Sequence, residues 1–130
     1  MRRLPVCVIG EWGEKMAKYE RRLYGDFKQI LADIDEEIMG NLSASLEEQS
    51  NLAVKGCRCA VRVYERYSLV GGNRVSLSVT LVETEEGIYL SAITAGGSTA
   101  MFFKLNTLGE TAFLEKLDVI IQRYGDKSRA

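Results

Sequence analysis

Alternating apolar residues in two stretches constrain the fold of this chain more than any other feature. In residues 57–69 and 74–83, apolar side chains recur at every second position except at Glu65 and Glu83. This period of two places them on one face of an extended strand, so each stretch predicts a β-strand buried on one side. The residues predicted to face the core are Cys57, Cys59, Val61, Val63, Tyr67, Leu69, Val75, Leu77, Val79 and Leu81.

The turn between these two strands is expected to be longer than two residues. A two-residue turn at Gly71 and Gly72 would give paired residues numbers with an odd sum. Apolar side chains would then lie opposite polar ones, and the core face would be lost. A three-residue turn that includes Asn73 removes this conflict, so we predict pairs whose numbers have an even sum.

Two other segments have the period of amphipathic helices, and each has a capping signal. In the first, Asp26 is the predicted N-cap and Gly40 the predicted stop, while residues 18–24 are expected to extend the helix or lead into it. The second begins with a capping box at Thr107 and ends at Gly125. The two apolar stripes are formed by Phe27, Ile30, Leu31, Ile34 and Ile38, and by Phe113, Leu117, Ile120, Ile121 and Tyr124.

Three further short strands complete the expected fold. They span residues 42–47, 88–95 and 101–105 and are separated by glycine-containing turns. The sheet and both helices each have one apolar face, which must be buried against another element. We therefore predict a single α+β domain over residues 16–130. It is a two-layer sandwich in which an N-terminal and a C-terminal helix pack on one face of an antiparallel meander of four or five strands.

Residues 1–15 are predicted to be a non-native extension or a disordered lead. Back-translation of residues 12–16 gives a purine-rich GGGGNGA string just before an ATG codon, which has the form of a bacterial ribosome-binding site. Translation would then begin at Met16. The alternative is a genuine N-terminal strand at residues 6–9.

The composition excludes several classes of function. The 130-residue chain has no histidine, which removes histidine-activated nucleophiles, HExxH zinc chemistry and imidazole pH switching. A formal net charge of −1 gives no general attraction to nucleic acid or to anionic membranes, and no apolar run is long enough to span a membrane. Three cysteines without a disulfide-scaffold spacing indicate free thiols in a reducing cytoplasm. We expect no cofactor.

Glu65 is the first candidate site residue. It shares the parity of the predicted core face, which would aim its carboxylate at the core side of the sheet. A carboxyl group held there would have a raised pKa and could donate a proton. The alternative is that a β-bulge or the rim of the sheet turns Glu65 to water.

The opposite parity predicts a basic, hydroxyl-rich sheet face. An arginine-bearing sheet with an aromatic residue can bind single-stranded RNA or a phosphorylated ligand. A solvated face or a polar dimer surface is the favoured alternative, because no RNA-binding motif accompanies the arginines. The candidate ligand-binding residues on this face are Arg58, Arg62, Tyr64, Arg66 and Arg74, beside Ser76, Ser78 and Thr80.

A glycine-rich segment at residues 95–99 supplies weaker candidates. It has no GKS/T ending and leads into a predicted strand, so we interpret it as a turn near which an anion site remains open. Cys57 and Cys59 are interpreted as core thiols rather than a metal site, because no further ligands accompany them. No catalytic residue is assigned. The ligand candidates of the segment are Ser98, Thr99 and Lys104.

Two segments carry a family resemblance: GGNRVSLSVTLVE at residues 71–83 and ITAGGSTAMFFKLNTLGETAFL at residues 93–114. They resemble a domain-of-unknown-function family of uncharacterised bacterial proteins found mainly in Firmicutes. The resemblance covers about residues 16–124, and its most specific part is the GGS…FFK…GE.AFL pattern. The family has no established activity, so the resemblance implies only that residues 96–104 carry what its members share.

These observations support three hypotheses. The first is a non-catalytic cytoplasmic domain for binding or assembly, which self-associates as a homo-oligomer through strand edges and a sheet face. The second is a small-ligand-binding protein or enzyme that uses Glu65 or the Ser98–Lys104 segment. The third is RNA binding through the arginine-bearing face, although nucleic acid is not the expected partner and neither is a membrane.

Overall fold

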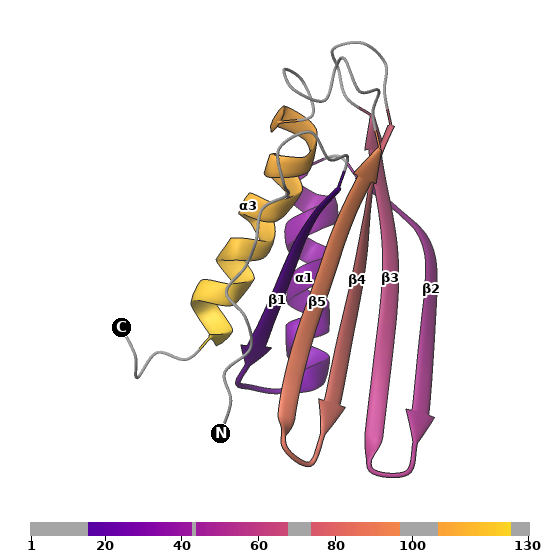
Figure 1. Cartoon of the computed structure of the whole chain (residues 1–130), viewed down its shortest axis with the longest axis vertical. Helices are drawn as coiled ribbons and strands as arrows, with labels where there is room; N and C mark the ends of the chain where they lie inside the picture. The colour runs from indigo at the N-terminus through magenta and orange to yellow at the C-terminus, as the bar shows by residue number, and fades with distance from the viewer. Residues whose placement is uncertain (1–15, 43, 68–73, 97–106, 126–130) are drawn as a thin grey trace.

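The computed structural model describes residues 16–42, 44–67, 74–96 and 107–125, which form one antiparallel sheet and two helices (Figure 1). The predicted extension over residues 1–15 and the predicted strand at residues 101–105 lie outside the described residues. The elements are β1 (Met16–Leu23), α1 (Phe27–Leu42), β2 (Ser45–Val54), β3 (Cys57–Tyr67), β4 (Arg74–Thr84), β5 (Gly87–Gly96) and α3 (Thr107–Tyr124).

The sheet has five strands in the order β1-β5-β4-β3-β2, and every neighbouring pair is antiparallel. Strands β2 to β5 form the meander that the sequence predicts. β1 precedes α1 in the chain and lies beside β5, at the opposite edge of the sheet from β2 (Figure 1). The predicted α+β class is confirmed.

Both helices pack on the same side of the sheet, and their predicted apolar stripes are confirmed. At the start of α1, the Asp26 Oδ2 atom accepts a hydrogen bond from the Gln29 backbone N–H at 2.9 Å, so the predicted N-cap is correct. Neither helix is long and apolar enough to cross a membrane. One core joins the layers through Tyr19, Leu23, Phe27, Ile30, Ile34, Ile38, Ala60, Tyr64, Val75, Leu77, Val79, Leu81, Ile88, Leu90, Ala92, Phe113, Leu117, Ile120 and Ile121.

Two segment boundaries differ from the predictions. Residues 18–24 do not extend the helix, because residues 16–23 form β1 and pair with β5 along their whole length. α1 continues past Gly40 to Leu42, and the predicted strand at residues 42–47 is replaced by the longer β2. β1 escaped prediction because charged residues break its apolar alternation, and of the side chains described from residue 18 to residue 23 only Tyr19 and Leu23 are buried in the core.

The register between β3 and β4 is the one that the sequence analysis rejected. The pairs run from Arg58 opposite Glu83 to Tyr67 opposite Arg74, so paired numbers have an odd sum. The turn is longer than two residues, as predicted, but the even register is wrong. Because β4 directs its odd-numbered residues to the helices, β3 directs its even-numbered residues there. Four such residues of β4 have no exposed surface: Val75, Leu77, Val79 and Leu81.

We call the two sides of the sheet the helix side and the open face. No helix among the described residues covers the open face. Its residues on the three central strands are Cys57, Cys59, Val61, Val63 and Glu65 of β3, Ser76, Ser78, Thr80 and Val82 of β4, and Tyr89, Ser91, Ile93 and Ala95 of β5.

Candidate functional site

β3 places four of the predicted site residues together on the helix side rather than on the outer face. Tyr64 is fully buried, and its ring belongs to the core. The prediction that these four residues face outward is therefore wrong. A tyrosine ring and the aliphatic parts of arginine side chains bury more apolar area than valine or cysteine, so these residues occupy the helix side of β3. The four residues are Arg58, Arg62, Tyr64 and Arg66.

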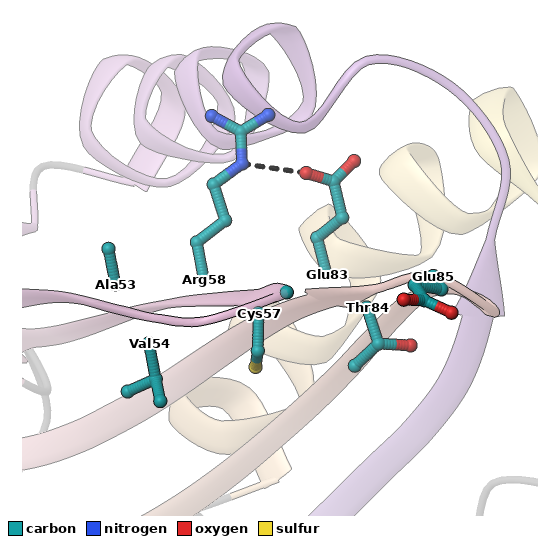
Figure 2. A pocket seen from close by; sticks show the side chains of 8 residues that line it. Ala53, Val54, Cys57, Arg58, Glu83, Thr84 and Glu85 are labelled. Atoms are coloured by element: carbon teal, nitrogen blue, oxygen red, sulfur yellow. Dashed lines mark hydrogen bonds and ion pairs between the residues drawn. The ribbon is translucent and has the colours of Figure 1, made fainter.

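Arg58 lies at the end of the sheet, beneath α1. Its Nε donates to Glu83 Oε1 at 2.6 Å, and its Cζ lies 4.5 Å from the centre of the Phe27 ring. Figure 2 shows both charged side chains on the α1 side of the sheet, while Val54 and Cys57 point the opposite way. The charge of Arg58 is therefore already neutralised within the protein.

A surface pocket of about 400 Å³ lies beside this ion pair, at the turn between β2 and β3 (Figure 2). Of the predicted site residues that the structure describes, only Arg58 lines it. The lining offers one thiol and no histidine to activate it, and the described residues contain no acid and thiol cluster suited to a metal ion. The lining residues are Ala53, Val54, Gly56, Cys57, Arg58, Glu83, Thr84 and Glu85.

Arg62 and Tyr64 lie further along the same side of β3. The Tyr64 hydroxyl donates to the Asp35 carboxylate on α1, and burial together with this bond raises the pKa of Tyr64 well above its ordinary value. Arg62 is 6% exposed, and its Nη1 donates to Asn51 Oδ1 on β2 at 3.0 Å. Its Nε is buried and has no hydrogen-bond partner among the described residues. Sequence reasoning missed this buried cation because it placed Arg62 in water.

Glu65 and Arg74 lie on the open face. Arg74 donates to Glu65 in an ion pair, and Ser76 Oγ is 3.4 Å from the other carboxylate oxygen. The predicted position of Glu65 on the core side is wrong, because the odd-numbered residues of β3 face away from the helices rather than toward them. The predicted alternative of a bulge at Glu65 does not apply to the β3–β4 ladder, whose register is regular there. Glu65 is thus a paired surface carboxylate.

The open face combines hydroxyl and small apolar side chains. The predicted outward direction of Ser76, Ser78 and Thr80 is confirmed, since each is half-buried beside fully buried neighbours. Cys57 and Cys59 also face this side as partly exposed free thiols, so their assignment to the core is wrong. Ser78 and Thr80 therefore lie opposite Val63 and Val61 of β3, and Ser76 lies opposite Glu65, so no arginine of β3 faces these hydroxyls.

The glycine-rich segment adds nothing to the described site. Ser98, Thr99 and Lys104 lie outside the described residues, and β5 ends at Gly96.

The edge strand β2 has a feature that sequence reasoning missed. Eight of its ten residues are uncharged, and both faces of the strand are exposed from Glu47 to Val54. The signal was the uncharged run at residues 49–54 that follows Glu47 and Glu48.

Solved structures are similar to this chain at low sequence identity. The protein MLL2253 from Mesorhizobium loti matches with a TM-score of 0.50 and 17% identity, over 85% of this chain and 98% of that one. The Pseudomonas aeruginosa protein of unknown function PA94, which has been suggested to be a regulator, matches with a TM-score of 0.48 and 16% identity. That match covers 62% of this chain and only 56% of the PA94 chain. Identities this low concern the fold alone.

The sequence itself matches one family model. No curated protein matches the chain. The model of a family of unknown function, DUF6054, matches residues 16–125, which include every helix and strand described above. The chain therefore belongs to the DUF6054 family of unknown function.

Proposed function

We propose that this domain is a non-catalytic assembly module whose copies associate through the open face. The observation that carries the proposal is the distribution of charge on that face. β4, the central strand, presents only Ser76, Ser78, Thr80 and Val82 between its ends, and none of these is charged. Charged side chains of the face lie toward the outer strands and the sheet ends.

The side chains of β4 suit a two-fold axis that runs along this strand. In such an arrangement each residue on the axis meets its own symmetry mate. A hydroxyl can donate and accept a hydrogen bond, so Ser78 and Thr80 can each pair with a copy of themselves. A carboxylate or a guanidinium in the same place would meet an identical charge. Val82 would meet an identical apolar group.

The strands on either side of β4 complement each other under the same axis. The axis places β5 of one copy over β3 of the other, because these strands flank β4 on opposite sides. Ile93 of β5 lies in the same cross-strand row as Val63 of β3, and Tyr89 lies in the same row as Cys59. Apolar side chains would thus meet across the interface. Ile93 is 37% exposed in the single chain, so such burial would remove apolar area from water.

Charge on the outer strands favours an axis parallel to the strands over one that crosses them. Lys18, Glu20 and Arg22 of β1 share the open face and carry a net positive charge, while Glu48 of β2 faces the same way at the other edge. A parallel axis brings β1 of one copy to β2 of the other and sets the net positive charge of β1 against Glu48. An axis across the strands would bring β1 to β1 and set like charges together, which is unfavourable.

The area of the open face suits a dimer of ordinary size. Five strands at about 4.8 Å spacing and about eight residues at roughly 3.4 Å give a flat area of about 650 Å². A standard protein interface buries about 800 Å² on each partner. The flat area of the open face is therefore near the lower end of the standard size range.

A charge placed on the proposed axis tests the assembly. In Thr80→Glu two carboxylates would face each other, so we expect the dimer dissociation constant from sedimentation equilibrium to rise by roughly 100-fold or more. Gln122→Glu makes a similar charge change on an exposed position of α3 and should leave it unchanged. Circular dichroism checks that both variants fold. A wild-type monomer at high concentration, or a folded Thr80→Glu dimer of unchanged affinity, would refute the proposal.

A further inference from the structure

The two edges of the sheet differ in how they are protected against pairing. β1 carries a run of charged residues, including Glu20, Arg21 and Arg22, of the kind that blunts an exposed edge. β2 has Glu47 and Glu48 at its beginning, where a register shift interrupts the ladder with β3. Such a bulge also discourages further pairing. These devices are confined to one end of β2.

The remainder of β2 has neither charge nor bulge. Residues 49–54 pair regularly with β3 on their inner side, and as an edge strand they have no outer neighbour in the described sheet. Leu52 is 58% exposed and Val54 is 69% exposed, both on the open face. An uncharged edge with exposed apolar side chains is a template for one more strand.

The helix side of this edge contains the buried cation described above. Arg62 has no ion pair with any carboxylate of the described residues. Among the described residues, its Nη1 donates to neutral oxygens alone: Asn51 Oδ1 at 3.0 Å, the Val61 carbonyl at 3.1 Å and the Ser50 carbonyl at 3.5 Å. Its buried Nε has no partner among the described residues. A guanidinium withdrawn from water gains most from a carboxylate partner.

We infer that residues 49–54 of β2 accept an extended segment of another protein as a sixth strand, and that this segment carries an acidic side chain on the helix side. The guanidinium of Arg62 already reaches across from β3 to Asn51 on β2. An added strand would lie about 4.8 Å beyond β2. A carboxylate opposite Asn51 would then come within reach of Arg62, while apolar side chains would lie beside Leu52 and Val54.

A second copy of the chain fits this edge less well. Antiparallel pairing of residues 49–54 with themselves would bring only Gln49, Asn51 and Ala53 of the partner to the helix side, since these alternate with the open-face residues. None of the three is acidic, so Arg62 would gain no carboxylate. The segment that fits is a foreign one, with apolar and acidic residues at alternating positions.

Peptide probes test the inference on the wild-type protein. One fluorescent eight-residue peptide alternates valine and threonine and has glutamate at a central helix-side position. Two matched peptides have glutamine or lysine there. Fluorescence anisotropy should show that the glutamate peptide binds roughly tenfold tighter than the glutamine peptide, as a charged hydrogen bond would give. The lysine peptide should bind weakest. Equal affinities, or no binding of any peptide, would overturn the inference.

Variants locate the binding to Arg62 and to the β2 edge. Arg62→Met should abolish the preference for glutamate over glutamine. Adjacent residues of an edge strand direct their N–H groups alternately inward and outward. Proline has no N–H group, so one of Leu52→Pro and Ala53→Pro removes an N–H that points to β3, and the other removes an N–H that points away from the sheet. The variant that removes the N–H pointing away from the sheet should keep the wild-type melting temperature and lose peptide binding.

The outcome is separable from the proposed self-association. Thr80→Glu should leave peptide binding unchanged, because Thr80 lies on the central strand and not at the edge. If the stable proline variant instead converts a dimer into a monomer and no peptide binds, the β2 edge belongs to a second copy, and the inference of a foreign acidic segment is wrong.

Discussion

Asp33 is the residue that joins the two helices most directly. Its carboxylate on α1 accepts hydrogen bonds from the Tyr124 hydroxyl and from Arg123 Nη1 of α3, the latter at 3.1 Å, and another from the Gln29 side chain at 2.9 Å. The hydrogen bond from Tyr124 is the main cause that holds the pKa of Asp33 below its usual value of 3.8. Asp33 therefore stabilises the fold in its charged form.

Asp33→Asn is expected to lower stability at neutral pH and to make it less sensitive to acid. Because the folded-state pKa lies below 3.8, the carboxylate contributes fully above that pH and loses its contribution as pH falls through the folded pKa. Urea unfolding at a series of pH values measures this. The gap in unfolding free energy between wild type and variant should narrow below about pH 4. A gap that stays constant down to pH 2 would contradict the assigned role.

Tyr64→Phe is expected to cost about 1–2 kcal/mol at pH 7, because the hydroxyl that meets Asp35 is lost. The raised pKa of Tyr64 means that its contribution is present below the unfolded value of 10.0 and is lost as pH rises further. The stability gap between wild type and variant should therefore shrink above pH 10, as measured by denaturant unfolding. A gap that widens at alkaline pH would show that the hydroxyl is not held neutral by its surroundings.

The same residue explains why one face assignment failed. Parity alone indicated that Cys59, Val61 and Val63 of β3 would be buried, and no rule based on the period of two separates that choice from its opposite. The structure buries Tyr64 and the stems of Arg58 and Arg62, because a tyrosine with a partner for its hydroxyl fills more core volume. That partner, Asp35, lies 29 positions away in the chain. Such a contact cannot be seen in a local pattern.

At the level of elements, those with a strong local signal were predictable and the sheet edges were not. α1 has a cap and a five-residue apolar stripe, and β4 alternates from Arg74 to Leu81, so both were found within a few residues of their bounds. β1 and β2 owe their strand conformation to pairing with β5 and β3, and few of their own residues are buried. Tertiary pairing overrides weak local preference in such strands.

Two glycines should respond in opposite directions to substitution by alanine. Gly96, at the end of β5, has a φ of 132°, and an added Cβ would lie 2.3 Å from the Arg74 carbonyl oxygen. Gly96→Ala should therefore destabilise the domain by about 1–3 kcal/mol or more. Gly40 lies in α1 with no atom within 4 Å of an added Cβ, so Gly40→Ala should stabilise by about 0.5–1 kcal/mol. Thermal unfolding of both variants measures this, and shifts of the same sign would contradict the described backbone.

For the whole molecule, the decisive property is that both helices lie on one side of the sheet. The sequence predicted this layering, and it predicted the hydroxyl face of β4, because both follow from periodicity. It did not predict which residues of β3 would accompany those hydroxyls, nor the buried guanidinium of Arg62 beside β2, because both depend on the β3–β4 register. A two-fold axis along β4 would cover the open face and leave β2 at an outer edge in each copy.

Small-angle X-ray scattering of the wild-type protein tests the face-to-face arrangement most directly. Two 130-residue chains stacked through their sheets should scatter as one compact particle with twice the mass of the chain and a radius of gyration of about 18 Å. A single-chain mass with a radius of gyration of about 14 Å would contradict the account. So would an elongated particle of twice the mass, in which the sheets meet edge to edge.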